Sequence, residues 1–529
     1  MARSLLRSTS VVGGMTLLSR VLGFARDIIF AHSFGAGLVM DAFFVAFKIP
    51  NFMRRMFAEG AFSQAFVPVL GEVRAEGGDA AVREFVARIT GTLSLIVGVI
   101  TVIGIVAAPI LIYVFAAGFA ADPDKYAMSV AMLRLTFPYL LFISLTALAG
   151  GVLNTYGRFG VPAFTPVILN ILLIGAAIGL APMLPNPGMA LAWGVLIAGI
   201  VQLAFQFPFL WRLRLLPRPR LPRGHPAVRR TLRLMLPALF GSSASQFNLL
   251  IDNLIASFLA TGSVSWLYYS DRLMEFPLGV FAIALATVIL PGLSAHHAKR
   301  AGEAFSATID WALRLVLVIV LPAAVGLFML AGPLIATLFR YGEFSGHDVR
   351  MAHWSLMAYA FGLMGFTLVK VLAPGFYARQ DVRTPVRVGV IAVCANITLN
   401  GAITAPMALL GFRAPHAGLA LATSLAAFVN AGLLFWGLRR KGVYRAASGW
   451  APLAIRVAIA NGAMAAVLAV GVGPLSLWLE WAGLERAWHL ALWIAVAVVV
   501  YFAVLLLAGL RPRHLRATDG LTSDSVLSP

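Results

Sequence analysis

The sequence RAWHLALWIAVAVVVYFAVLLLAG, residues 486–509, decides the class of fold. After Arg486 and His489 it holds only apolar side chains, and its length matches the roughly 20 residues that a helix needs to cross a bilayer. Similar runs recur along the whole chain of 529 residues, of which 60% are hydrophobic and 12% charged. A soluble protein has about 25% charged residues. The composition therefore excludes a soluble enzyme, a disordered protein and a protein with a single membrane anchor, and it predicts an all-α polytopic membrane protein.

Working outward from this run, apolar stretches between glycine, proline and charged breaks predict about 14 transmembrane helices. The first two have the lowest hydropathy, because charged residues interrupt them. The predicted spans are residues 10–35, 40–70, 88–117, 128–153, 161–182, 189–211, 231–260, 265–294, 307–338, 350–376, 386–409, 416–437, 451–473 and 486–509.

Basic residues outnumber acidic ones by 41 to 21, which gives a net charge of +20. In a soluble chain this excess would suggest nucleic acid, but here 26 of the 41 fall in the two termini and in the loops after even-numbered predicted helices. The positive-inside rule places those segments, and so both termini, in the cytoplasm without a nucleic-acid partner. Ten basic residues remain inside predicted spans. Because a lipid-facing arginine at the bilayer centre costs at least ~2.5 kcal/mol, these residues imply an interior, hydrated cavity.

The sequence contains no catalytic motif that would indicate an enzyme instead of a transporter. Cys394 is the single cysteine, which excludes an intramolecular disulfide and a cysteine zinc site. The nine histidines show no HExxH spacing, and the absence of a Walker A motif excludes ATP as the direct energy source. Asp122 and Asp124 resemble part of a DxD metal motif, but beside Pro123 and Lys125 we expect a solvated turn. The sequence predicts a transporter rather than an enzyme.

The two halves of the chain look like copies of each other. The end of the second predicted helix, FVP at residues 66–68, matches ILP at 289–291, and Pro162 matches Pro385 at the same offset of 223. Parallel repeats of this kind enclose a central site in transporters and alternate its access. We therefore predict two pseudo-symmetric six-helix lobes around a central cavity. The predicted segments are a lobe at 1–211, a basic, proline-rich cytoplasmic linker at 212–230, a lobe at 231–440, two extra helices at 441–510 and a cytoplasmic tail at 511–529.

The charged residues inside the first, second and eighth predicted helices are the candidate functional residues. Asp41, Lys48, Arg55 and Glu59 share one face of the second helix. One explanation is internal pairing, of Arg26 with Asp27 or Asp41, of Arg55 with Glu59, and of Arg272 with Glu275. The other is function, the default for charges inside a membrane. Because arginine contacts phosphate oxygens bidentately, we expect the cavity to receive an anion.

Four segments resemble the MurJ/MviN lipid II flippases of the multidrug/oligosaccharidyl-lipid/polysaccharide exporter superfamily. They are SRVLGFARD at 19–27, DAFFVAFKIPNFMRRMFAEGAFSQAFVPVL at 41–70, SVSWLYYSDRLMEFP at 263–277 and VKVLAPGFYARQDVRTP at 369–385. The second is highly specific. The resemblance covers essentially the whole chain and implies fourteen helices in two six-helix lobes, with the last two helices forming a groove for a lipid tail. It implies transport of lipid II, the undecaprenyl-pyrophosphoryl disaccharide-pentapeptide, from the inner to the outer leaflet of the bacterial inner membrane for peptidoglycan synthesis.

Carried over residue by residue, the resemblance implies a set of substrate-binding side chains. The cavity arginines of the family correspond to Arg20, Arg26, Arg54 and Arg272. Further positions of functional interest are Asp41, Asn51, Arg55, Glu59 and Ser265. A bare pyrophosphate cannot cross hydrocarbon, whereas a wet cavity lined by arginines can shield it while the polyprenyl tail stays in lipid.

A coupling-ion site is a second implication of the resemblance. Some members of the family are thought to bind sodium where this chain has Asp252, Asn396, Asn400 and Thr423, which all offer oxygen ligands. Asn400 stands where other members have a carboxylate, so only one negative charge remains. The alternative role for these four side chains is hydrogen bonding between helices. Apart from this ion, the sequence implies no cofactor.

Two other functions stay open at this point. A cation-coupled exporter of small molecules on the same superfamily fold would want acidic and aromatic residues in its cavity, and a non-transporting scaffold has no reason to bury arginines. The expected partners are lipid II and membrane lipids, together with cell-wall synthesis proteins. Because an internal cavity needs no second copy, we expect a monomer.

Overall fold

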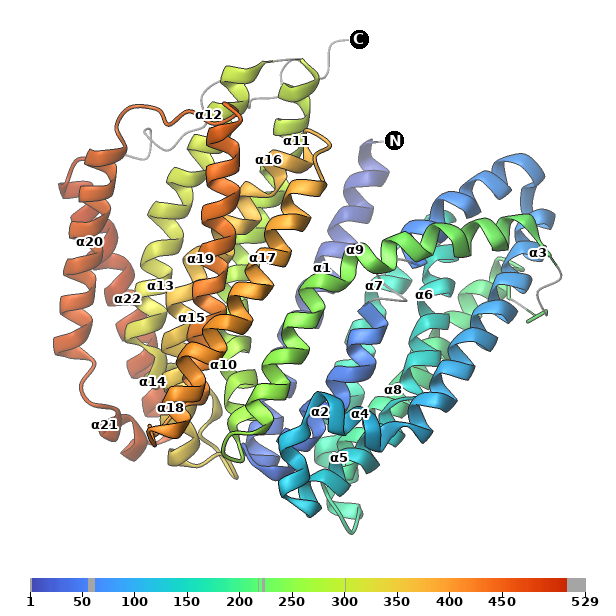
Figure 1. Ribbon diagram of the computed structural model, residues 1–529, viewed down its shortest axis with the longest axis horizontal. Helices are drawn as coiled ribbons and strands as arrows, with labels where there is room; N and C mark the ends of the chain where they lie inside the picture. The colour runs from blue at the N-terminus through green and yellow to red at the C-terminus, as the bar shows by residue number, and fades with distance from the viewer. Residues whose placement is uncertain (1, 56–61, 217, 221–223, 300, 511–529) are drawn as a thin grey trace. The chain divides into compact units, whose positions relative to one another are not determined.

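The computed structural model describes the chain except for residues 1, 56–61, 217, 221–223, 300 and 511–529. Every regular element of the described residues is helical, as predicted (Figure 1). The chain divides into two compact units. The first contains the chain up to Ser265 together with Tyr341–Phe344, and the second contains Trp266–Arg340 and the chain from Ser345 onward.

The first unit is built from nine α-helices among its described residues. They are α1 (Ala2–Phe34), α2 (Leu38–Arg54), α3 (Ser63–Val106), α4 (Ala108–Phe115), α5 (Pro123–Thr136), α6 (Tyr139–Thr155), α7 (Gly160–Gly175), α8 (Met189–Arg212) and α9 (Pro226–Ser257). Helix α1 packs against α7, α2 against α5, and α6 against both α3 and α8. Buried aromatic side chains fill the spaces between them, among them Phe43, which stacks on Phe47 at a centroid distance of 5.7 Å.

The second unit holds the remaining helices. They are α10 (Ser263–Pro277, which starts at the end of the first unit), α11 (Ile283–Ala298), α12 (Gly302–Leu315), α13 (Leu321–Met329), α14 (Ala331–Phe339), α15 (Gly346–Leu372), α16 (Pro374–Tyr377), α17 (Arg383–Leu399), α18 (Ala405–Leu409), α19 (His416–Arg440), α20 (Trp450–Gly471), α21 (Leu475–Glu480) and α22 (Gly483–Leu507). Helix α19 lies alongside α15 and α17, and α20 lies alongside α22 (Figure 1). Helix α15 starts with a capping box, in which Ser345 and Asp348 satisfy each other's backbone N–H groups.

Among the described residues, ten helices are long and apolar enough to cross a membrane. They correspond to ten of the predicted spans, from the third to the sixth and from the ninth to the fourteenth. The other four predicted spans, 10–35, 40–70, 231–260 and 265–294, are helical where they are described. In the first two of these spans, charged residues such as Arg20, Arg26 and Lys48 interrupt the apolar run. The two weakest spans of the sequence analysis are in this group.

The predicted spans 40–70 and 88–117 imply a loop at residues 71–87, and this prediction is wrong. Helix α3 runs through it from Ser63 to Val106 and is interrupted only at Gly78, whose φ of +62° kinks the chain. A left-handed φ costs glycine little, so one residue is enough to join two helical segments. The alanine, glutamate and arginine residues of this stretch have high helix propensity, although their charge made it resemble a loop.

Helix α9, which we predicted to begin the C-terminal lobe, belongs to the first compact unit. It packs against α3, and Arg230 near its start pairs with Glu72. At its other end the Ser257 hydroxyl accepts a hydrogen bond from the backbone N–H of Gly118, at 3.0 Å. A side chain at position 118 would collide with the Ser257 carbonyl, so glycine is required for this close approach.

A buried carboxylate fixes the chain between α19 and α20. Asp310 of α12 accepts hydrogen bonds from the Tyr444 hydroxyl at 2.8 Å and from the indole nitrogen of Trp450 at 2.7 Å. Arg314, one turn along the same helix, donates its Nε at 2.7 Å. Burial, followed by the hydrogen bond to Asp310, raises the pKa of Tyr444 above its usual range. Asp310 therefore ties the chain that leads into α20 to α12.

We expect Asp310→Ala to destabilise the protein by about 3 kcal/mol, because it leaves a buried tyrosine hydroxyl, a half-buried indole and a guanidinium without their acceptor. The measurement is chemical unfolding of the purified protein in detergent micelles. Glu303→Ala, an exposed acidic residue of the same helix, serves as the control and should change stability by less than about 0.5 kcal/mol. Equal effects of the two substitutions would contradict the anchoring role.

Candidate functional site

Asp41, in the first turn of α2, is a buried charge of the first unit. Its carboxylate pairs with the Lys125 ammonium at 2.8 Å and accepts hydrogen bonds from the backbone N–H groups of Gly262 and Ser265 at 2.8 and 2.9 Å. The Ser265 hydroxyl donates a fourth hydrogen bond at 2.6 Å. Asp41 and Ser265, both predicted site residues, are thus in direct contact. Together they tie α2 to α5 and to the start of α10.

The conformation of Gly262 makes this network possible. Its φ of +100° lies in the region that favours glycine, and it turns the N–H toward Asp41 just before α10 begins. The solvated turn that we predicted for Asp122 and Asp124 does not include Lys125, a residue that is only 3% exposed. Asp122 instead caps α5 by accepting from the Lys125 backbone N–H at 3.1 Å.

The second buried cluster centres on Arg26 of α1, which is 8% exposed. Its Nε and Nη2 atoms donate to one carboxylate oxygen of Asp27, at 3.0 and 2.6 Å, and Nη1 donates to the Asn170 side chain on α7 at 3.1 Å. The Asn170 amide donates in turn to the Ser19 carbonyl at 2.9 Å. Of the two pairings considered for Arg26, with Asp27 or with Asp41, the structure contains the first. The guanidinium therefore holds α1 against α7.

Polar side chains follow one another along the end of α2. The Lys48 ammonium donates to the Asn253 side chain of α9 at 2.6 Å, and the Arg54 Nε atom donates to Asn51 at 2.9 Å. Arg55, the C-cap of α2, is exposed. Glu59, its predicted partner, lies outside the described residues. The structure brings together Asn51 and Arg54, both of which we predicted as site residues.

Two predicted arginines are accessible. Arg20, on α1, is exposed. Arg272 belongs to the second unit, where it pairs with Glu275 one turn further along α10, at 3.0 Å. That exposed pair agrees with the internal pairing considered from the sequence, and surface pairs of this kind contribute only about 0–1 kcal/mol. Arg20 is therefore accessible to a ligand, and a ligand that displaces Glu275 from Arg272 breaks only this weak pair.

The predicted cation ligands belong to two different units. Asp252 is half-buried on α9, where the Asn248 amide donates to it at 3.4 Å. In the second unit, Asn396 and Asn400 are buried near the end of α17, and the Thr423 hydroxyl of α19 donates to the Asn396 side chain at 3.5 Å. The Thr423–Asn396 contact joins α19 to α17, as the alternative role requires, whereas the Asn248–Asp252 contact lies within α9. Among the described residues, no group of three His, Cys, Asp or Glu side chains is placed to hold a metal ion.

Sequence reasoning missed three partners of the predicted residues, namely Lys125, Asn170 and Asn253. Each meets its partner from more than 80 positions away in the sequence, as in the 84 residues between Asp41 and Lys125. One signal was present. A buried asparagine or lysine inside a predicted span needs a polar partner, so Asn170 in the fifth span and Asn253 in the seventh were candidates from the start.

Comparison with known proteins assigns the chain to a protein family. A model of the family described as lipid II flippase MurJ matches residues 30–491 of the chain. The chain belongs to the MurJ family. The "probable lipid II flippase MurJ" of Vibrio cholerae serotype O1 is 46% identical over 523 residues, which cover 98% of both chains. The "lipid II flippase MurJ" of Burkholderia cenocepacia is 41% identical over 522 residues, which cover 97% of this chain and 99% of the relative.

Solved structures agree with this MurJ assignment. The lipid II flippase MurJ in an inward closed conformation matches with a TM-score of 0.74 at 25% identity, over 94% of this chain and 99% of that one. An inward-facing multidrug resistance transporter of the MATE family matches with a TM-score of 0.65 at 15% identity, over 82% of this chain and 98% of that one. The second likeness concerns the fold alone. The resemblance inferred from the sequence motifs and the predicted multi-pass helical membrane fold are both confirmed.

Proposed function

We propose that this chain is a lipid II flippase, which moves the undecaprenyl-pyrophosphoryl disaccharide-pentapeptide from the inner to the outer leaflet of the bacterial inner membrane for peptidoglycan synthesis. The observation that carries the proposal is the full-length identity to relatives that bear this name, which reaches 46%. The membership of the MurJ family makes the chain a transporter rather than an enzyme. The buried and half-buried charges of α1 and α2 support an anionic headgroup as the cargo.

Four arginines are proposed to bind the pyrophosphate, namely Arg20, Arg26, Arg54 and Arg272. Arg20 can do so directly because it is exposed. Arg54, whose Nε atom donates to Asn51, lies half-buried near the end of α2. Arg26 must exchange the Asn170 side chain for the ligand while it keeps Asp27. Such an exchange makes the position of α7 sensitive to the cargo, which suits alternating access.

The remaining site residues are proposed to shape and regulate this binding. Asn51, Arg55 and Glu59 would contact or orient the headgroup near the end of α2. Asp41 and Ser265 would hold α2 and the start of α10 in place through their hydrogen bond. The oxygen atoms of Asp252, Asn396, Asn400 and Thr423 are proposed to bind a coupling ion, sodium in the first instance.

We propose further that both termini lie in the cytoplasm, since 26 of the 41 basic residues then face the anionic inner leaflet. The working unit is proposed to be a monomer, because a cavity inside one chain needs no second copy. Cell-wall synthesis proteins that receive lipid II at the outer leaflet are the proposed partners, and no nucleic acid takes part.

The test of this function is leaflet-resolved lipid II labelling in cells that depend on this protein. After depletion we expect lipid II to accumulate in the inner leaflet and to become inaccessible from outside. Re-expression of the wild-type chain should restore access, as should Arg413→Gln, which removes an exposed charge outside the proposed site. Unchanged outer-leaflet lipid II in depleted cells would contradict the proposal.

A further inference from the structure

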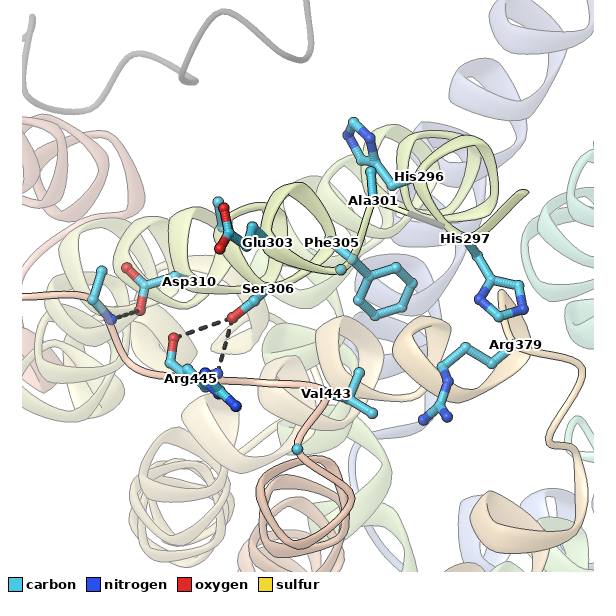
Figure 2. A pocket seen from close by; sticks show the side chains of 14 residues that line it. His296, His297, Ala301, Glu303, Phe305, Ser306, Asp310, Arg379, Val443 and Arg445 are labelled. Atoms are coloured by element: carbon cyan, nitrogen blue, oxygen red, sulfur yellow. Dashed lines mark hydrogen bonds between the residues drawn. The ribbon is translucent and has the colours of Figure 1, made fainter. Parts of the chain in front are cut away.

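A second group of basic side chains surrounds a cavity of about 740 Å³ in the second unit, which we call the loop pocket (Figure 2). Three segments that lie far apart in the sequence form its wall. These are the end of α11 with the start of α12, the turn after α16, and the chain between α19 and α20. All three follow even-numbered predicted helices, so the sequence assigns them to the same side of the membrane. Its size falls in the range of small-molecule sites, about 300–1,000 Å³.

The wall of the pocket carries an arginine whose hydrogen-bonding capacity is not used. The Nη1 atom of Arg379 is buried, and it meets no hydrogen-bond acceptor among the described residues. A buried guanidinium nitrogen without an acceptor costs free energy, and an anionic ligand would recover it. Figure 2 shows His297 of α11 on the same side of the pocket as Arg379. An imidazole beside a guanidinium adds a second donor for the same ligand.

Other features of the pocket also favour an anion. Helix α12 begins in its wall with Ala301 as the N-cap, so no side chain caps the first backbone N–H groups. The N-terminus of a helix attracts negative charge. Arg445 lines the opposite side in Figure 2, and its backbone exchanges hydrogen bonds with the Ser306 hydroxyl at 2.9 and 3.1 Å. Phe305 and Val443 supply apolar wall between the two arginines.

The acidic residues nearby do not neutralise this charge. Asp310 is used by Arg314, Tyr444 and Trp450, as described above. Hydrogen bonds from Lys441 at 2.6 Å and from Thr384 at 2.7 Å hold the pKa of Asp381 at about 2 and consume that carboxylate. Glu303 is exposed in the first turn of α12, and Figure 2 shows it across Phe305 from His297.

From this arrangement we infer that the loop pocket is a binding site for a phosphate-bearing ligand, with Arg379 and His297 as the phosphate contacts and Arg445 as a second anchor. Guanidinium forks and helix N-termini are the groups that proteins use for phosphate. The volume exceeds what one inorganic phosphate needs, and the apolar wall fits a ligand that carries carbon atoms beside its phosphate. Two sources share this chemistry, an anionic phospholipid headgroup at the membrane surface and a soluble phosphate monoester.

The experiment uses the full-length protein in nanodiscs of phosphatidylcholine, with glycerol 3-phosphate as the probe and calorimetry as the readout. We expect saturable binding by the wild type. Arg379→Gln should weaken it by about tenfold or more, since it removes a charge-assisted contact. Arg413→Gln, an exposed arginine of the loop before α19, is the matched control and should bind as the wild type does.

A second variant covers the case in which Arg379→Gln does not fold. Ala307 is exposed and lines the pocket on α12, so Ala307→Glu adds a carboxylate without removing any packing and should abolish binding. Absence of saturable binding by the wild type would overturn the inference. So would binding by folded Arg379→Gln and Ala307→Glu that equals the wild type.

Changing the lipid of the nanodisc distinguishes the two candidate ligands, a phospholipid headgroup and a soluble phosphate monoester. In one outcome, the wild type is folded in phosphatidylglycerol discs but no longer binds glycerol 3-phosphate there. The pocket then takes a lipid headgroup. If binding is equal in the two kinds of disc, the pocket takes a soluble phosphate monoester. Both results uphold the phosphate site, and neither requires lipid II, so failure of this test and failure of the proposed flippase function are distinguishable.

Discussion

Replacing Arg26 with glutamate should abolish lipid II translocation. The substitution puts a second carboxylate beside Asp27, which has no exposed surface, and it removes the donor that Asn170 accepts. Breaking a buried ion pair by removing one partner costs about 3–5 kcal/mol. The same change removes one of the four guanidinium groups proposed to bind pyrophosphate. The measurement is outer-leaflet lipid II in cells whose only flippase is the variant.

Two matched variants separate binding from folding. Arg26→Lys keeps the charge but loses the bidentate fork, so we expect a protein that reaches the wild-type level in the membrane and translocates lipid II more slowly. Asn170→Ala keeps the Arg26–Asp27 pair but removes the contact with α7, so we expect translocation slower than that of the wild type and faster than that of Arg26→Glu. Wild-type translocation by Arg26→Glu would show that Arg26 neither binds the substrate nor holds α1 in its working position.

Much of the fold follows from the sequence because hydrophobic length is a strong signal in a membrane protein. The run at 486–509 predicts a helix that the structure places at Gly483–Leu507. The signal weakens where charged residues interrupt the run, as in α1 and α2. It fails where a charged segment is helical outside the apolar stretch, as around Gly78 of α3, because hydropathy does not report on helix propensity.

The site was predictable only in part, for a different reason. A charged residue inside an apolar span is visible in the sequence, so Arg26, Asp41 and Arg54 could be selected from the sequence and from the family resemblance. Their partners could not, because a contact across 84 or 144 residues depends on how helices pack. Lys125 shows the difference most clearly. Its neighbours Asp122 and Pro123 are typical of an exposed turn, yet the helix that they start points the lysine into the interior.

A double-mutant cycle on Asp41 and Lys125 should give a strongly asymmetric result. Asp41→Ala leaves a buried ammonium without its anion and should destabilise the protein by about 3–5 kcal/mol in detergent unfolding experiments. Lys125→Met should cost less, because three donors from Gly262 and Ser265 still satisfy the carboxylate.

The double variant should therefore be more stable than the sum of the two losses predicts, with a coupling energy of about 1–3 kcal/mol. Lys441→Met is the matched control, since it breaks an ion pair with Asp381 of similar length at the surface and should cost no more than about 1 kcal/mol. Additive losses at positions 41 and 125 would mean that the buried pair contributes no more than this exposed one. In that case the hydrogen bonds of Ser265, rather than the charge of Lys125, would hold α2 to the start of α10.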